Sequence, residues 1–191
     1  MTITYVLLLL LNLAIGWWNC RVIGEVWDES KFVGGYMRVL VWCAAVQSAV
    51  AFSSVLVVLL GIGAYLSGHL TLAQAEAVQG LWYLLVIFPA VGTGLVLTIN
   101  SLITAWRERS MASIGVAAWN TFSTLRNLHG ASEALPKVWE KVSNALKDNK
   151  NGKSTAIIVL ALLAVLGGVV LTAALIRYYA RRAEVPMAVQ A

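Results

Sequence analysis

Four long stretches of the chain contain no charged residue, and this pattern sets the expected architecture. They cover residues 1–20, 39–75, 77–106 and 154–176. A helix that crosses the hydrocarbon core of a bilayer needs about 20 mainly apolar residues. The pattern therefore predicts an all-α, polytopic integral membrane protein with four transmembrane helices. Those helices are expected at about residues 3–19, 38–65, 80–105 and 154–177.

The composition agrees with this expectation, because 60% of the 191 residues are hydrophobic and only 12% are charged. A soluble domain carries charge on about a quarter of its residues. The first apolar stretch lacks the basic start and the small-residue cleavage site of a signal peptide, so we expect it to be retained. Trp17 and Trp18 at its end, and Trp106 at the end of the third stretch, fit aromatic belts at the membrane surface.

The positions of the 14 lysine and arginine residues predict the orientation. Three lie in or beside residues 20–37, and eight lie in residues 106–153. The last three, Arg177, Arg181 and Arg182, lie just before or inside the C-terminal tail (178–191). With four crossings, the first two groups share one face, which the positive-inside rule places in the cytoplasm. The basic tail then lies outside, unless one segment re-enters and the number of crossings is odd.

Residues 106–153 form the largest polar region, and apolar stripes at helical spacing run through residues 111–125 and 135–146. Gly130 can end the first helix, and Pro136 suits the first turn of a second one. The sequence thus predicts a cytoplasmic amphipathic helical hairpin. Its apolar faces need the bilayer surface, residues 20–37 or another subunit. The aromatic candidates for docking a partner are Trp119, Phe122 and Trp139. Acidic residues interleave with the basic ones, so we expect no nucleic acid as a partner.

The predicted spans contain no Asp, Glu or Lys, which argues against a proton relay or an ion-coupled carrier. Well inside these spans lie the amide side chains of Asn12, Gln47 and Asn100. One interpretation is hydrogen bonding between helices, worth about 0.6 kcal/mol each on average. The other is that these amides face a wet pore formed by several subunits.

Small residues recur at helical spacing on three of the predicted spans. They are Ala44, Ser48, Ala51, Ala90, Gly94, Thr98, Ala164, Gly168 and Thr172. Small faces let helix backbones approach closely, and this packing drives association in lipid. Three such faces exceed what one small bundle needs, so they predict a homo-oligomer.

Pro89 removes a backbone hydrogen bond inside the third span and predicts a kink there. The kink can be a static packing device or a gating hinge. Cys20 and Cys43 provide neither a metal site nor a disulfide framework. We expect no catalytic residues, no metal and no cofactor.

The sequence divides into four expected parts. These are a membrane domain (1–105), the hairpin (106–153), a fourth transmembrane helix (154–177) and a basic tail (178–191). The pattern favours a non-enzymatic oligomer that assembles in a bacterial inner membrane and permeabilises or remodels it, as phage holins and membrane-acting defence effectors do. The alternative is a scaffold or sensor subunit of a larger membrane complex, whose hairpin docks a soluble cytoplasmic protein.

Overall fold

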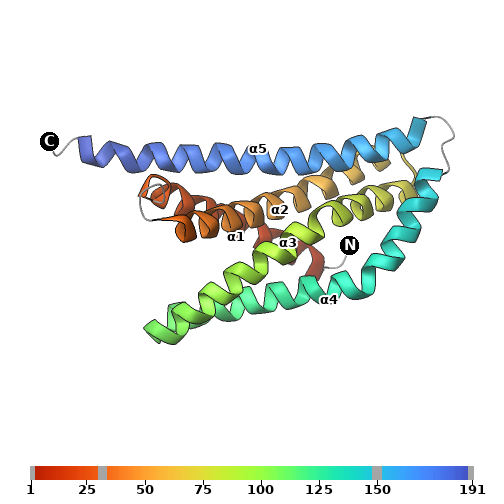
Figure 1. Ribbon diagram of the computed structural model, residues 1–191. Coiled ribbons are helices and arrows are strands. Elements are labelled where there is room, and N and C mark those ends of the chain that lie inside the picture. Colours follow the sequence, from red (N-terminus) through yellow and green to blue (C-terminus); the bar gives the residue numbers. More distant parts are fainter. Residues whose placement is uncertain (1–2, 30–33, 148–151, 189–191) are drawn as a thin grey trace. The chain divides into compact units, whose positions relative to one another are not determined.

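Five helices make up the part of the chain that the computed structural model describes, namely residues 3–29, 34–147 and 152–188 (Figure 1). They are α1 (Ile3–Val26), α2 (Gly35–Leu66), α3 (Leu72–Glu108), α4 (Met111–Lys147) and α5 (Lys153–Ala188). These described residues contain no strand, which confirms the all-α prediction. Residues 148–151 of the predicted hairpin segment and residues 189–191 of the tail lie outside the described residues.

Four of the helices are long and apolar enough to cross a membrane, as the sequence predicts. The qualifying segments are Val6–Val26, Gly35–Leu66, Leu72–Glu108 and Lys153–Ala183. Each is longer than the transmembrane helix expected from the sequence at that place. The helix α3 has 37 residues, which at 1.5 Å per residue is about 55 Å of helix.

The chain divides into two compact units. One consists of Met1–Val55 with Gly167–Ala191, and the other of Leu56–Leu166. The first unit therefore contains α1, most of α2 and the second half of α5. The second unit contains α3, α4 and the remaining parts of α2 and α5.

In the first unit, α1 and α2 run in opposite directions. A Cβ atom added to Gly16 would lie 3.3 Å from Ala51 Cβ and from the ring of Phe52. Eleven residues further along the chain, just past the end of α1, Trp27 packs edge-on against Trp42, with ring centroids 6.0 Å apart. The residue numbers rise on α1 while they fall on α2, so the pair is antiparallel.

By contrast, α1 and α5 run in the same direction. Cys20 Sγ lies 4.0 Å from the carbonyl oxygen of Thr172. One turn later, a Cβ atom on Gly24 would lie 2.4 Å from Tyr179 Cβ and 3.0 Å from the backbone nitrogen of Ala180. The residue numbers therefore rise together on both helices.

The core of this unit is built from small and medium-sized side chains of α1, α2 and α5. Its buried members are Cys20, Ile23, Val41, Ala45, Phe52 and Ile176. Cys20 and Cys43 are both buried free thiols. A free thiol of this kind packs as a small apolar group.

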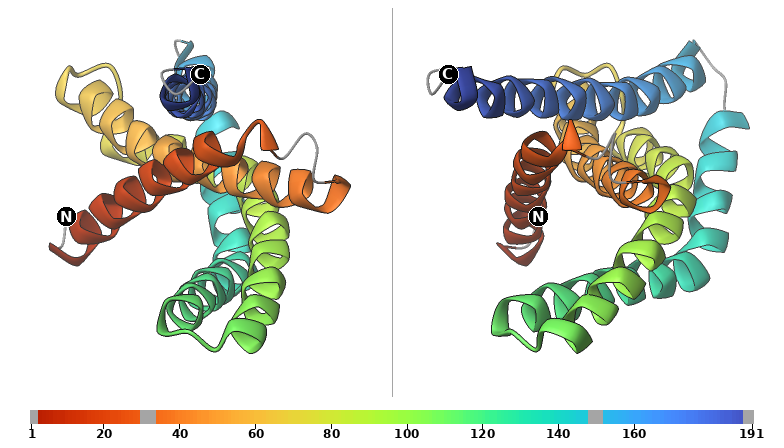
Figure 2. Two further views of the ribbon diagram at one scale, coloured as in Figure 1. Left: turned by 90° about the vertical axis from the view of Figure 1, so that its left-hand side faces the viewer. Right: turned by 60° about the vertical axis from the view of Figure 1, so that its left-hand side comes forward.

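The second unit is dominated by an antiparallel pair of helices, α3 and α4, which lie side by side in both views of Figure 2. At one end of the pair, the side chains of Val138 and Val142 pack over Gly80. Further along, the buried hydroxyl groups of Thr98 and Thr124 are 3.0 Å apart and share a hydrogen bond.

The predicted helix end at Gly130 is wrong, because α4 continues from Met111 to Lys147. A glycine inside a helix costs only about 1 kcal/mol relative to alanine. Here it also leaves room for the neighbouring helix, since a Cβ atom on Gly130 would lie 3.0 Å from Tyr83 Oη. Pro136 stands in the interior of α4 instead of starting a second helix, and Figure 1 shows α4 changing direction along its length. The hairpin partner of α4 is α3.

The helix α3 starts eight residues before the expected residue 80 because its N-terminus is capped. Thr71 accepts a hydrogen bond from the backbone nitrogen of Gln74, and the Gln74 side chain accepts one from the backbone of Thr71. This capping box satisfies two of the free donors of the first turn. At the other end, Arg109 adopts a left-handed conformation, with φ 50°, and its N–H donates to the Ala105 carbonyl.

Candidate functional site: a basic and aromatic hollow

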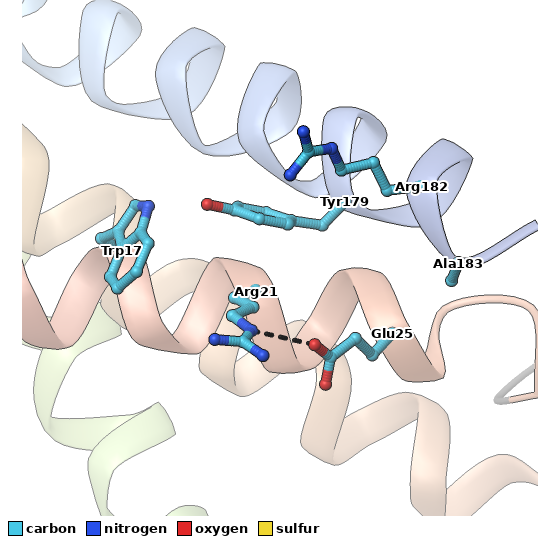
Figure 3. A pocket seen from close by; sticks show the side chains of 6 residues that line it. All are labelled: Trp17, Arg21, Glu25, Tyr179, Arg182 and Ala183. Carbon is cyan, nitrogen blue, oxygen red and sulfur yellow. Dashed lines mark hydrogen bonds and ion pairs between the residues drawn. The ribbon is translucent and has the colours of Figure 1, made fainter. Parts of the chain in front are cut away.

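The ends of the parallel helices α1 and α5 enclose a hollow of about 400 Å³ (Figure 3). Three of its lining residues, Trp17, Arg21 and Glu25, recur every four positions and so share one face of α1. The other three, Tyr179, Arg182 and Ala183, come from one face of α5. Ligand sites in proteins occupy about 300–1,000 Å³, so the hollow has the size of a small site.

The hollow exists because Gly24 lets the two helices touch beside it. No side chain larger than hydrogen fits at Gly24, where a Cβ atom would overlap Tyr179 Cβ at 2.4 Å. Since the backbones approach closely there, the longer side chains on either side of the contact form the walls of the hollow. The ring of Tyr179 lies edge-on to Trp17, with centroids 6.3 Å apart, and stiffens one wall.

The polar groups of the hollow are mainly hydrogen-bond donors. Arg21 Nε donates to Glu25 Oε1 over 2.9 Å, and both side chains are about half exposed. Arg182 adds a second guanidinium from α5, and Figure 3 shows the hydroxyl end of Tyr179 directed toward Trp17. Two cations and one carboxylate leave the lining with a net positive charge.

Aromatic rings hold both guanidinium groups in place. The Arg21 guanidinium carbon lies 5.5 Å from the Trp18 ring centroid. On α5, that of Arg182 lies 5.1 Å from the ring centroid of Tyr178. A cation over an aromatic face within about 6 Å is attracted by the ring quadrupole. A contact of this kind takes up none of the hydrogen-bond donors of a guanidinium, so its N–H groups can still donate to an anion.

The small residues predicted to pack helices are buried or half-buried within this one chain. Gly168 is the tightest example, because a Cβ atom there would lie 2.4 Å from the Ala49 carbonyl oxygen and 2.8 Å from Ser53 Cβ. The other eight positions are Ala44, Ser48, Ala51, Ala90, Gly94, Thr98, Ala164 and Thr172. Since these faces are already covered, they no longer argue for contacts between subunits.

The three amides predicted to line a pore or to join helices are all half-buried. Asn12 and Gln47 belong to the first unit, on α1 and α2, whereas Asn100 belongs to the second unit, on α3. Neither unit therefore contains all three. Beside Pro89 on α3, Thr93 Oγ1 donates to the Pro89 carbonyl oxygen over 2.6 Å, a side-chain bond of the kind that bends helices.

The aromatic residues predicted to dock a partner are on α4, and two of them are strongly exposed. Phe122 is 57% exposed and Trp139 65% exposed, while Trp119 is half-buried with its ring centroid 6.1 Å from that of Phe122. Trp119 and Phe122 thus form one cluster. Trp139 lies more than four turns away, in the charged half of the helix.

Sequence reasoning missed the hollow because it placed the ends of α1 and α5 on opposite faces of a membrane. The i, i+4 spacing of Trp17, Arg21 and Glu25 was visible, but the partner helix lies more than 150 residues away in the chain. Among the described residues, no group of His, Cys, Asp and Glu could hold a metal ion. Comparison with protein-family models, curated proteins and solved structures finds no match.

Proposed function

We propose that this chain is an integral membrane protein that assembles with copies of itself in the bilayer and permeabilises or remodels it. Membrane insertion is supported by the large apolar side chains that the fold leaves uncovered, such as Leu59, Phe88 and Val170, each more than 60% exposed. Each lies on a helix that is long and apolar enough to cross a membrane. Exposing apolar surface to water costs about 25 cal/mol per Å², a cost that acyl chains remove.

The packing of α1 against α5 bears on how the chain crosses the membrane. Because the two helices are parallel, they cross a bilayer in the same direction, and their C-terminal ends share one face. The scheme of four crossings has them cross in opposite directions, so it does not fit this packing. We therefore favour five crossings, in which α4 returns through the membrane beside α3.

The first half of α4 suits a fifth crossing. Residues 110–125 carry no charge and span about 24 Å as a helix. With five crossings, eight of the 14 basic residues lie on the face that holds the ends of α1 and α5. The positive-inside rule then makes that face cytoplasmic and puts the connection between α4 and α5 outside.

Cysteine labelling distinguishes the two topologies. In a chain with Cys20→Ala and Cys43→Ala, single cysteines are placed by Ala183→Cys or Lys147→Cys, both at exposed positions. A membrane-impermeant maleimide is then added to intact cells. Five crossings predict labelling at position 147 and protection at position 183. The reverse result restores the scheme of four crossings, with residues 106–153 in the cytoplasm.

Self-association is supported by the second apolar face of α4. The first face of α4, with the buried residues Ser113, Ala117 and Thr124, packs in the pair that α4 forms with α3. Other apolar side chains in the first half of α4 are between 48% and 86% exposed, among them Met111, Ile114, Phe122 and Leu125. An apolar face beyond the one buried in the hairpin gives a second copy a surface to pack against. This exposed face is the observation on which the assembly proposal rests.

The assembly proposal is tested by expressing the chain and following membrane potential and dye efflux, with the subunit number measured in nanodiscs. We expect Phe122→Ala to reduce both efflux and oligomer content. Phe88→Ala removes another exposed phenylalanine, on α3, and serves as the matched control. A monomer at every concentration, with unchanged membrane potential, contradicts the proposal. If the amides line a channel, Gln47→Leu or Asn100→Leu abolishes the conductance.

The exposure of Trp139 favours the second candidate function, a scaffold that docks a soluble protein. Its indole is 65% exposed and its neighbours Glu140 and Lys141 are charged, which suits a contact outside the acyl region. This function predicts harmless expression and co-purification of a soluble partner that is lost with Trp139→Ala. Loss of membrane potential on expression, with no such partner, decides for assembly.

A further inference from the structure

The hollow between α1 and α5 combines three properties that the proposed function does not use. Its lining is donor-rich, with the guanidinium groups of Arg21 and Arg182 and the hydroxyl of Tyr179. Each guanidinium group also lies over an aromatic ring. The side chains of Arg21 and Glu25 are about half exposed, so the hollow is open to the surroundings of the helices.

The chemistry of the lining selects an oxyanion. Guanidinium groups present planar N–H donors that match phosphate, and such charge-assisted hydrogen bonds are about twice as strong as neutral ones. The carboxylate of Glu25 accepts a hydrogen bond from Nε of Arg21. The other N–H groups of Arg21 lie outside that hydrogen bond. A phosphate group would therefore meet donors from both helices, with Glu25 as the one opposing charge.

The position of the hollow selects a lipid as the source of that phosphate. Trp17 and Tyr179 line it, while Trp18 contacts Arg21 and Tyr178 contacts Arg182. Aromatic rings of this kind collect at the level of lipid headgroups. Toward the middle of the same two helices, Leu10 and Val170 are exposed apolar side chains along which acyl chains can lie.

We propose that this hollow binds the phosphate group of an anionic phospholipid in the leaflet that faces the C-terminal ends of α1 and α5. The proposal rests on the membrane insertion proposed above. It depends on the parallel packing of α1 and α5, because only then do Arg21 and Arg182 meet at one membrane face.

The test uses the full chain in neutral detergent, with bound lipids counted by native mass spectrometry. Phosphatidylglycerol is compared with phosphatidylcholine of the same chain length. We expect tighter binding of phosphatidylglycerol, weakened about fivefold by Arg21→Gln or by Arg182→Gln, since a basic residue near an anionic surface contributes about a factor of five. Glu25→Gln removes the opposing charge and should strengthen binding, which a merely misfolded variant cannot do.

Arg177→Gln is the matched control, because Arg177 is an exposed arginine of the same helix that does not line the hollow. Equal losses for Arg177→Gln and Arg182→Gln would show diffuse attraction by the basic tail and overturn the site. Displacement of the lipid by millimolar inorganic phosphate would assign the hollow to a soluble anion and overturn the lipid source.

A carbonate wash of cell membranes separates this proposal from the one on which it rests. If the wash releases the chain, membrane insertion itself fails. If the chain stays in the membrane but shows no preference for phosphatidylglycerol, only the lipid site fails.

Discussion

Replacing Gly168 by alanine tests the packing of α2 against α5 most directly. The added Cβ atom would lie 2.4 Å from the Ala49 carbonyl oxygen, 2.8 Å from Ser53 Cβ and 2.9 Å from the Ser53 backbone nitrogen. Two of these three atoms belong to the backbone of α2, so no rotation of a side chain relieves the overlap. The helices have to separate by about 1 Å, which forfeits a quarter to a half of the dispersion energy between the atoms in contact.

The expected loss of stability follows from two opposing effects. Overpacking of a tight contact costs about 1–3 kcal/mol, whereas alanine in place of glycine inside a helix returns up to about 1 kcal/mol. We therefore expect Gly168→Ala to lower the free energy of unfolding by about 1–2 kcal/mol. Burial of the nearby Thr172 and of Ser48 on α2 should fall as well.

The measurement is unfolding of the purified chain in mixed detergent, followed by helix content, with Gly63→Ala as the control. Gly63 likewise lies inside a helix, α2, but no atom lies within 4 Å of its added Cβ. Gly63→Ala should therefore be neutral or stabilising. The reasoning is refuted if Gly168→Ala is as stable as Gly63→Ala, because the close approach of α2 and α5 would then be absent from the protein.

Three further predictions concern α3 and α4. Thr98→Val and Thr124→Val should each lower the free energy of unfolding by about 0.6 kcal/mol, and at most by about 1.7 kcal/mol. The double variant should cost less than the sum of the two, because both changes remove the same hydrogen bond, and a double-mutant cycle on unfolding in detergent measures this. Thr71→Ala removes the cap of α3 and should cost about 1 kcal/mol, with faster hydrogen exchange confined to the first turn, so uniform exchange contradicts the capping box. Lys141→Gln breaks a 3.6 Å ion pair with Glu76 whose side chains are 73% and 54% exposed, so stability should change by less than about 1 kcal/mol at any salt concentration.

The sequence predicts the helices of this fold better than their partners. Charge-free runs locate four apolar helices because the exclusion of charge from a hydrocarbon environment acts on each helix separately. Pairing depends on shape, which no periodicity records. Gly130 resembles a helix stop in the sequence, yet in the structure it makes room for the hydroxyl group of Tyr83.

The candidate site illustrates the same limit. The sequence marks Trp17 and Tyr179 as interfacial aromatics, but their ring contact depends on α1 and α5 being parallel. The positive-inside rule counts charges and treats helices as independent, so it put these residues on opposite faces. Gly24 is where the two helices come closest to each other's backbone, and one glycine among 15 carries no distinguishing mark in the sequence.

The contact between Cys20 and Thr172 joins residues that are 152 positions apart in the chain. At about 5–20 residues per second, a ribosome needs roughly 8–30 s to make the segment between them. During that time the face of α1 that packs against α5 has no partner helix, because α5 is the last helix to be made. That face therefore stays uncovered in the nascent chain until the last helix is made.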